Sequence, residues 1–280
     1  MLEKDMRPNR FITMIKYTQE YVREFFEQNP ISQMSVLGMH DGLCIRISEL
    51  SGNPADHTSA IQDLRFPRNP QDIPKEPKGA PSLQNALELA RATLFHTPDH
   101  GTREIIFVFG SLLSLDPGDI NQSIKACVRD RVRVSIVGMS ARLRICTEIV
   151  SRTNAGDESE YVVATDQESL RELLLATTTP PVVRSTPNAN APSSESAAAL
   201  MMMGFPSRVI EDSPTMCACH GFLTTGGYTC SRCSAKVCSL PITCPSCQLT
   251  LLLSTHLARS YHHLFPLRNW AEVKIGRAHV

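Results

Sequence analysis

Seven of the ten cysteines in this chain lie between positions 217 and 247, and no other sequence feature restricts the possible folds as strongly. Two pairs have the spacing Cys-x-x-Cys, namely Cys230 with Cys233 and Cys244 with Cys247. Each such turn directs two thiolates at one ion, and two turns complete the tetrahedron that zinc prefers. The sequence therefore predicts a small zinc-stabilised module in which these four cysteines hold one structural Zn²⁺ ion.

Three further cysteines and a histidine near this motif leave alternatives open. Cys238 lies between the two pairs, where it can be a small buried apolar residue. Alternatively, Cys217, Cys219, His220 and Cys238 supply four more ligands, enough for a second zinc ion. The Cys-x-Cys spacing is a less regular chelate, which favours the one-ion interpretation. A thioredoxin-like redox pair is less favoured still, because it needs a βαβ setting and a helix that starts at the motif.

The charge balance and the start of the chain exclude other classes of protein. The 280 residues include 28 basic and 28 acidic side chains, so no bulk positive field favours strong direct binding to DNA. The longest apolar runs, such as 249–253, are far shorter than the roughly 20 residues of a membrane span. Residues 1–5 carry charges where a signal peptide needs an apolar stretch. We therefore expect a reducing, intracellular environment, in which clustered cysteines bind metal.

Residues 1–178 are predicted to form an α/β domain. The continuous apolar runs 105–109 and 132–137 are typical of strands covered on both faces. A hairpin is expected at His40-Asp41-Gly42, and Pro81 suits the first turn of a helix. Buried strands that alternate with helices predict a doubly wound fold with a largely parallel sheet. The predicted strands are 31–39, 43–48, 105–109, 132–137 and 161–164, and the predicted helices are 11–28, 82–95, 118–129, 141–152 and 167–176.

The segments around this domain suggest how the chain is organised. The domain begins with a helix, whereas the first strand of a doubly wound sheet is usually central, so we expect an N-terminally incomplete domain. Residues 179–212 are rich in Pro, Ser and Ala and predict a linker, and residues 213–273 form the predicted zinc module. Residues 274–280 resemble the translation of a sequencing adapter, so we expect them to lie outside the fold. No internal repeat is evident.

Two surfaces are candidates for contacts with other proteins. The module ends in an apolar tail, from Leu249 to Leu267. We expect that so small a module cannot bury this tail alone, which favours a protein–protein surface. Residues 213–270 contain no acidic side chain and few basic ones, a composition poorly suited to DNA. Arg131 and Arg133 share one face of their strand, which we expect at a sheet edge, either solvated or docking an acidic partner.

The sequence contains no Walker loop, GxSxG elbow, HExxH or GxGxxG motif. Its carboxylates are dispersed, and no pair of them can be assigned to one cleft. We therefore predict no catalytic residues and no enzymatic activity.

Four short segments carry a family resemblance: Gln28–Gln33, Glu49–Pro54, Gly79–Leu87 and the string HLARSYHHLFP at 256–266. Together they resemble the suppressor-of-stem-loop subunits of TFIIH over roughly residues 5–268. The resemblance implies a von Willebrand A-like domain followed by zinc modules, in a non-enzymatic nuclear subunit that acts in transcription and nucleotide-excision repair. It also implies that the A domain binds and stimulates the repair helicase, and that the four-cysteine zinc module docks a second A-domain subunit of the core complex.

The sequence departs from relatives of this family in two ways. Metal-binding A domains use an Asp-x-Ser-x-Ser loop, which is absent here, and the chain offers Gly110-Ser111 where such relatives place an aspartate. Ser82 alone cannot hold an ion, so no Mg²⁺ site is expected. The family also carries a RING-like zinc module beyond the HHLFP string, which this chain does not reach.

Two rival functions remain at this stage. One is a zinc-module component of a ubiquitin-ligase-type complex, which requires a cross-braced module with two zinc ions, so the number of zinc ions per chain separates it from a scaffold. The other is a metal-dependent A-domain ligand-binding protein, which the missing Asp-x-Ser-x-Ser loop disfavours.

Overall fold

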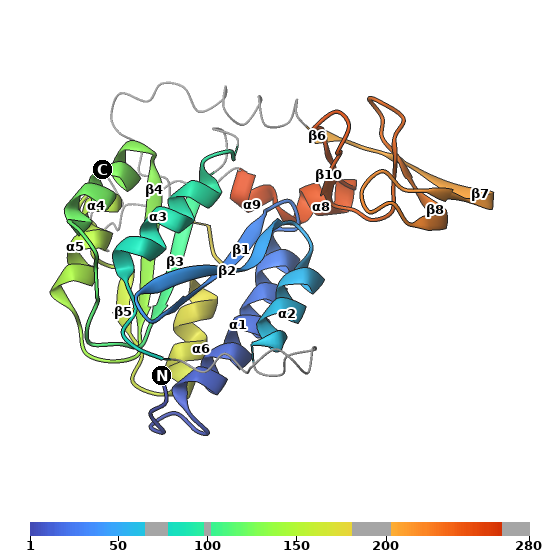
Figure 1. The fold of residues 1–280 in the computed structure, drawn as a ribbon. Coiled ribbons are helices and arrows are strands. Elements are labelled where there is room, and N and C mark those ends of the chain that lie inside the picture. The colour runs from blue at the N-terminus through green and yellow to red at the C-terminus, as the bar shows by residue number, and fades with distance from the viewer. Residues whose placement is uncertain (65–77, 98–101, 181–202, 265–280) are drawn as a thin grey trace, which may run out of the picture. The chain divides into compact units, whose positions relative to one another are not determined.

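A computed structural model describes residues 1–64, 78–97, 102–180 and 203–264 of the chain. These residues belong to two compact units, Met1–Thr178 and Thr179–Val280 (Figure 1). Most of the predicted linker and the tail at 274–280 lie outside the described residues. No helix that the structure describes is both long and apolar enough to cross a bilayer.

The first unit is built on a parallel sheet of three strands in the order β3 (Arg103–Phe109), β4 (Val132–Gly138) and β5 (Tyr161–Val163). Helices α4 (Ile120–Arg129) and α5 (Arg144–Thr153) connect these strands. The side chains of β3 alternate, because successive residues of a strand point to opposite faces. Ile105, Phe107 and Phe109 are buried in one apolar cluster, whereas Ile106 and Val108 pack against another.

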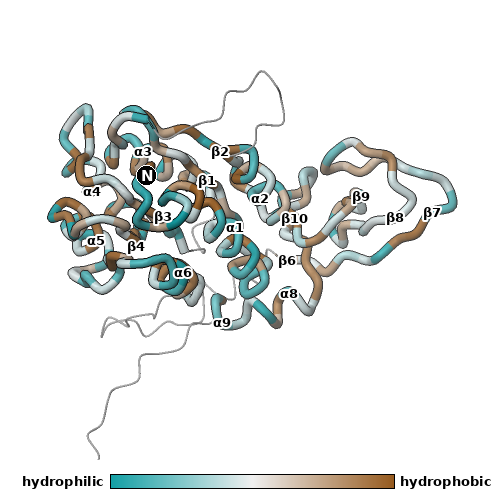
Figure 2. Tube along the Cα trace, turned by 90° about the horizontal axis from the view of Figure 1, so that it is seen from below, coloured by the Kyte–Doolittle hydropathy of each residue, from teal (hydrophilic) through white to brown (hydrophobic). Residues whose placement is uncertain are grey.

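Helices cover both faces of this sheet. The first cluster includes residues of α3 (Leu83–Leu94), α4 and α5, and the second includes residues of α1 (Arg10–Gln28) and α6 (Gln167–Ala176). The apolar strands β3 and β4 therefore run between two layers of helices (Figures 1 and 2). This arrangement confirms the predicted α/β class with a doubly wound parallel sheet.

The hairpin predicted near the start of the chain is present as β1 (Met34–His40) and β2 (Leu43–Ser51), which pair in antiparallel fashion. Asp41 and Gly42 have φ angles of 50° and 71°, which are typical of the type I′ turn that such hairpins favour. Within the described residues, this hairpin forms its own sheet, and no strand pairs with the outer edge of β3.

Two local predictions need correction. Helix α2 (Pro54–Asp63) was not expected, although its capping residue Asn53 and its first residue Pro54 are a standard helix start. Pro81 does not lie in the first turn of α3, because Ser82 is the N-cap: its hydroxyl oxygen accepts a hydrogen bond from the Asn85 N–H, and Pro81 precedes it.

In the described part of the second unit, the strands form two three-stranded sheets. One sheet contains β7 (Ser207–Met216), β8 (Leu223–Thr229) and β9 (Lys236–Val237), and the other contains β10 (Ile242–Thr243), β11 (Thr250–Leu251) and β6 (Met203–Gly204). The helices α8 (Ser254–Arg259) and α9 (Tyr261–Leu264) follow.

The apolar tail of the module differs from the sequence-based expectation at its beginning. Leu249, Leu251 and Leu252 are buried, and Leu249 and Leu251 pack with Cys230, Val237 and Cys244 in the core of the second unit. Leu249 and Leu251 therefore contribute to the module's core, whereas Tyr261 farther along the tail is 55% exposed and Phe265 and Leu267 lie outside the described residues.

Candidate metal centre

Three hairpins of the second unit are closed by turns of the same length. The turns 217–222, 230–235 and 244–249 are flanked by the paired residues Met216 and Leu223, Thr229 and Lys236, and Thr243 and Thr250. Each turn begins with a cysteine.

The three turns also share their backbone hydrogen bonds. In each, the N–H of the first residue donates to the carbonyl of the sixth, at 3.0, 2.9 and 2.8 Å, and the N–H of the fifth donates to the carbonyl of the first, at 3.0, 3.0 and 2.9 Å. The fifth residue always has a positive φ, 70° at Gly221, 61° at Ser234 and 60° at Gln248. The module therefore uses one turn geometry three times.

The structure brings the four predicted zinc ligands together. The second and third turns face each other, so that Cys230 Sγ lies 3.6 Å from Cys247 Sγ and Cys233 Sγ lies 3.5 Å from Cys244 Sγ. All four sulfurs are within 4.8 Å of one another. Tetrahedral zinc with Zn–S bonds of about 2.3 Å separates its sulfur ligands by about 3.8 Å, so this donor set fits Zn²⁺.

The backbone of the turn favours a thiolate at its first cysteine. Burial acts to raise the pKa of the Cys230 thiol, but the N–H groups of Cys233 and Arg232 donate toward its sulfur and lower the pKa to about 7. Because the thiolate is the form that binds metal, this geometry prepares Cys230 as a ligand.

A second donor group contains Cys217, Cys219, His220 and Cys238, whose ligand atoms also lie within 4.8 Å of one another. Cys238 is half-buried, and its Sγ lies 3.3 Å from Cys219 Sγ and 3.1 Å from His220 Nδ1. Its surroundings are polar donors, which disagrees with its interpretation as a buried apolar residue. In the part of the chain that the structure describes, these are the two groups of at least three His, Cys, Asp or Glu donors that could hold a metal ion.

The arginines near β4 do not form a sheet edge. β4 is the middle strand of its sheet, so the expectation that Arg131 and Arg133 lie at an edge was wrong. Arg131 precedes the strand and has a φ of 54°, whereas Arg133 is half-buried with its guanidinium 3.4 Å from the carboxylate of Glu160. The Arg133 side chain therefore already has an acidic partner within the unit.

Ser82 has a structural partner. Its hydroxyl donates to Asp116 Oδ1 at 3.0 Å, and the same oxygen accepts the Gln84 N–H at 2.8 Å and the Ser114 hydroxyl at 3.0 Å. Ser82 and Asp116 therefore fix the start of α3 against the loop that follows β3. That no Mg²⁺ ion binds in the first unit, at Ser82 or elsewhere, stays a prediction.

Besides scattered exposed residues such as Phe95 and Ile210, each unit has one group of exposed apolar side chains that are near one another in the sequence. In the first unit, Leu112, Leu113 and Leu115 lie in the loop between β3 and α4 and are all more than half exposed. In the second unit, Met216, Phe222 and Leu223 surround the first turn and are exposed to a similar degree. Contiguous exposed apolar residues are typical of protein–protein contact sites.

Comparison with known proteins identifies the family. The family model described as Ssl1-like matches residues 1–206. The chain belongs to this family. The Ssl1-like assignment confirms the resemblance seen in the sequence.

Named Ssl1-like relatives match over nearly the whole chain. General transcription and DNA repair factor IIH subunit ssl1 of Schizosaccharomyces pombe is 51% identical over 98% of this chain and 61% of its own length. General transcription factor IIH subunit 2 of Arabidopsis thaliana is 39% identical over 97% of this chain and 59% of its own length. The chain thus spans about three fifths of these relatives. Among solved structures, the SpRpn10 VWA domain aligns with a TM-score of 0.47 and 16% identity, covering 62% of this chain and 87% of that one.

Proposed function

We propose that this chain is a non-catalytic subunit of TFIIH that acts in RNA polymerase II transcription initiation and in nucleotide-excision repair in the nucleus. The observation that carries the proposal is the 51% identity to a factor IIH subunit over 98% of the chain, a stretch that includes both units. The repair helicase and a second A-domain core subunit are the proposed partners, and the near-zero charge agrees with partners that handle the nucleic acid.

The proposed cofactor is one structural Zn²⁺ ion at Cys230, Cys233, Cys244 and Cys247. The convergence of the four sulfurs supports this assignment. When bound, zinc supplies folding free energy to the module, because its thiolate ligands come from two turns that the ion ties together.

We assign the helicase contact to the von Willebrand A-like first unit, residues 1–178, and within it to the loop between β3 and α4. Leu112, Leu113 and Leu115 are 59%, 70% and 60% exposed, and burying such side chains in an interface is favourable by about 25 cal/mol per Å². The loop is held at its base by the hydrogen bonds from Ser82, Ser114 and the Gln84 N–H to Asp116. Its leucines are therefore presented on a fixed support.

The test is co-purification of the full chain with the repair helicase and stimulation of helicase ATPase activity. Leu113→Asp is expected to reduce binding at least tenfold, because a carboxylate cannot enter an apolar interface unpaired. Leu43→Asp is the matched control, since Leu43 is 58% exposed at the start of β2. Equal binding by both variants would contradict the loop assignment, and no binding by the unaltered chain would contradict the regulatory role.

We assign the contact with the second A-domain subunit to the apolar residues around the first turn of the zinc module. Phe222 is 68% exposed and stacks on His220 with ring centroids 6.0 Å apart. Phe222→Ser is expected to weaken the complex with that subunit, measured by co-expression and affinity purification. Phe205→Ser is the control, because Phe205 is 55% exposed in the same unit. The assignment is wrong if the Phe205 variant is as defective as the Phe222 variant.

A ubiquitin-ligase-type component is the second candidate function. The donors of the two groups alternate along the chain, in the order of the first turn, the second turn, Cys238 and the third turn, as a cross-braced module requires. A zinc count therefore no longer separates this candidate from a scaffold. An assay of ubiquitin transfer by the purified protein with a panel of conjugating enzymes separates the two candidates. Polyubiquitin formation that depends on Cys233 would support the ligase, and its absence supports the scaffold.

A further inference from the structure

The first turn of the module has the geometry of the two zinc-binding turns. Its six residues, Cys-Ala-Cys-His-Gly-Phe, form the same hydrogen bonds, and Gly221 has the positive φ that Ser234 and Gln248 adopt. In the second and third turns, the metal donors stand at the first and fourth positions, and the fourth position of the first turn is His220. The first turn is therefore a Cys-x-x-His counterpart of a Cys-x-x-Cys turn.

Backbone N–H groups contact the sulfur of the first cysteine in this turn, Cys217, as they contact that of Cys230. The backbone N–H groups of His220 and Phe222 are directed at the Cys217 sulfur. In both turns, one of the donors is the N–H of the fourth residue. The two turns thus share the N–H to sulfur contact as well as the hydrogen bonds between backbone groups.

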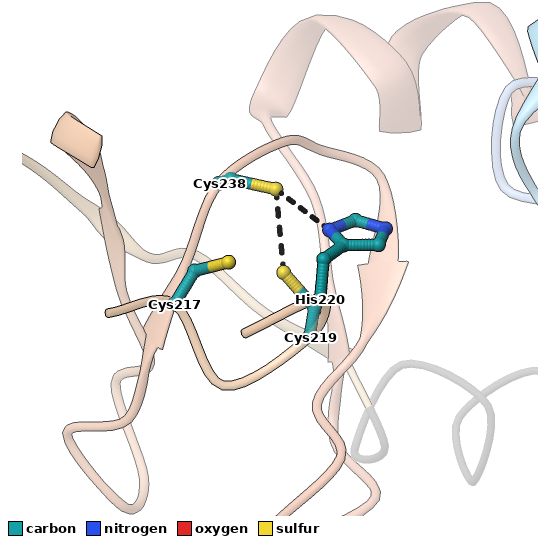
Figure 3. A group of neighbouring side chains, drawn as sticks. All are labelled: Cys217, Cys219, His220 and Cys238. Carbon is teal, nitrogen blue, oxygen red and sulfur yellow. Dashed lines mark hydrogen bonds between the residues drawn. The ribbon is translucent and has the colours of Figure 1, made fainter. Parts of the chain in front are cut away.

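The two donors that complete the group come from different places. Cys219 lies at the third position of the turn, and Cys238 follows β9 directly. Figure 3 shows the Cys238 sulfur directed at the His220 ring and at the Cys219 sulfur, with Cys217 beside them. The distances are 3.1 Å from Cys238 Sγ to His220 Nδ1 and 3.3 Å from Cys238 Sγ to Cys219 Sγ.

Strand pairing brings Cys238 to this position. β9 pairs with β8 through Tyr228 with Val237 and Thr229 with Lys236, and the Ala218 N–H in the first turn donates to the Lys236 carbonyl at 2.8 Å. Lys236 Nζ also donates to the Thr215 hydroxyl at 2.7 Å and to Glu211 Oε2 at 2.6 Å, both in β7. These bonds hold the end of β9 against the first turn.

We propose that Cys217, Cys219, His220 and Cys238 bind a second structural Zn²⁺ ion. Three thiolates and a neutral imidazole bound through Nδ1 form a Cys₃His site, and the thiol protons are released to solvent on binding. The proposal rests on the geometry of the module and not on the function proposed above.

The two ions are expected to stabilise each other. β9 lies between Cys233, a ligand of the four-cysteine site, and Cys238, a ligand of the second site. Each ion therefore fixes one end of β9. Loss of either ion loosens this strand, which positions ligands for the other ion.

The experiment measures zinc per mole of the purified full chain by inductively coupled plasma mass spectrometry. We expect two ions in the unaltered chain and one in the Cys238→Ser variant. Cys44→Ser is the matched control, because Cys44 is also a half-buried free cysteine but lies in the first unit, and it should retain both ions. One ion in the unaltered chain would overturn the proposal.

Variants of His220 separate ligation from folding, because this side chain is exposed. His220→Cys converts the first turn into a Cys-x-x-Cys turn and should keep both ions, whereas His220→Ala should lower the zinc content or increase the rate of zinc release to a chelator at least tenfold. Equal zinc content and release in both variants would overturn the role of His220.

Alkylation provides a measurement that needs no variant. In the unaltered chain, Cys217, Cys219 and Cys238 should resist N-ethylmaleimide until a chelator is added, as read by mass spectrometry of the peptides. Full modification without chelator, or a disulfide between Cys219 and Cys238, would overturn the proposal.

Discussion

At the scale of single residues, the fifth position of each turn carries the backbone strain. Ser234 and Gln248 adopt positive φ angles that cost an L-residue about 1–2 kcal/mol, whereas Gly221 adopts the same conformation without a Cβ penalty. The first turn is therefore the least strained of the three.

Gly221→Ala tests this interpretation cleanly. No atom lies within 4 Å of the Cβ that the substitution adds, so the cost arises from the backbone alone. We expect the free energy of unfolding of the zinc module to fall by about 1 kcal/mol, and Ser234→Gly to raise it by a similar amount. Denaturant unfolding followed by zinc release measures both, and unchanged stability in Gly221→Ala would contradict the argument.

Cys233→Ser is the corresponding test of the four-cysteine site. The substitution leaves three thiolate donors, and structural zinc contributes roughly 10–16 kcal/mol of binding free energy to such modules, so we expect the module to unfold. Zinc content and circular dichroism of the full chain measure the effect, with Cys44→Ser as the control. A Cys233→Ser chain that kept all of its zinc would mean that the ligands are misassigned.

At the scale of elements, helices α1 and α6 are joined by an ion pair on the surface. Arg171 Nε donates to Glu20 Oε1 at 2.8 Å, and a second guanidinium nitrogen of Arg171 contacts the same oxygen. The hydrogen bond from Arg171 lowers the pKa of the Glu20 carboxyl below its ordinary value. A lowered pKa means that the folded state favours the carboxylate.

The stability of the first unit should therefore depend on pH through this pair. Its contribution is present above the ordinary glutamate pKa of about 4.3 and is lost as the pH falls through the lowered value. Because both side chains are partly exposed, we expect Glu20→Gln to cost only about 0.5 kcal/mol at neutral pH and nothing in acid. Chemical denaturation at neutral pH and in acid measures the change in the free energy of unfolding. A double variant in which the charges of Glu20 and Arg171 are exchanged should recover most of the stability lost at neutral pH.

At the scale of the whole molecule, the two units depend on different sources of stability. The first unit has a sheet covered by helices on both faces, whereas the second has a small core that includes Cys230 and Cys244. A unit whose core contains metal ligands relies on the ion for its folding.

Removal of zinc should therefore unfold one unit and leave the other intact. We expect a strong chelator to abolish the thermal transition of the second unit and to shift that of the first by no more than a few degrees. Differential scanning calorimetry with and without the chelator measures both transitions. Simultaneous loss of the two would indicate that the first unit also needs the metal.

The sequence by itself predicted the features that depend on neighbours along the chain. Cys-x-x-Cys spacing marked the four-cysteine site, and apolar runs marked β3 and β4, because turns and strands are local. The Asn53-Pro54 start of α2 was overlooked, and Cys217, Cys219 and His220 were considered only as an irregular Cys-x-Cys chelate, without the Cys-x-x-His-Gly spacing at 217–221.

Only the tertiary structure decided how distant segments meet. Cys238 reaches His220, 18 residues away, because β9 pairs with β8, and strand pairing is not encoded in the spacing of ligands. Likewise, β4 became the middle strand, and Leu251 entered the core, through contacts with segments remote in the sequence. Spacing fixes which donors one turn can present, whereas the free energy of packing whole strands and helices determines which turns come together.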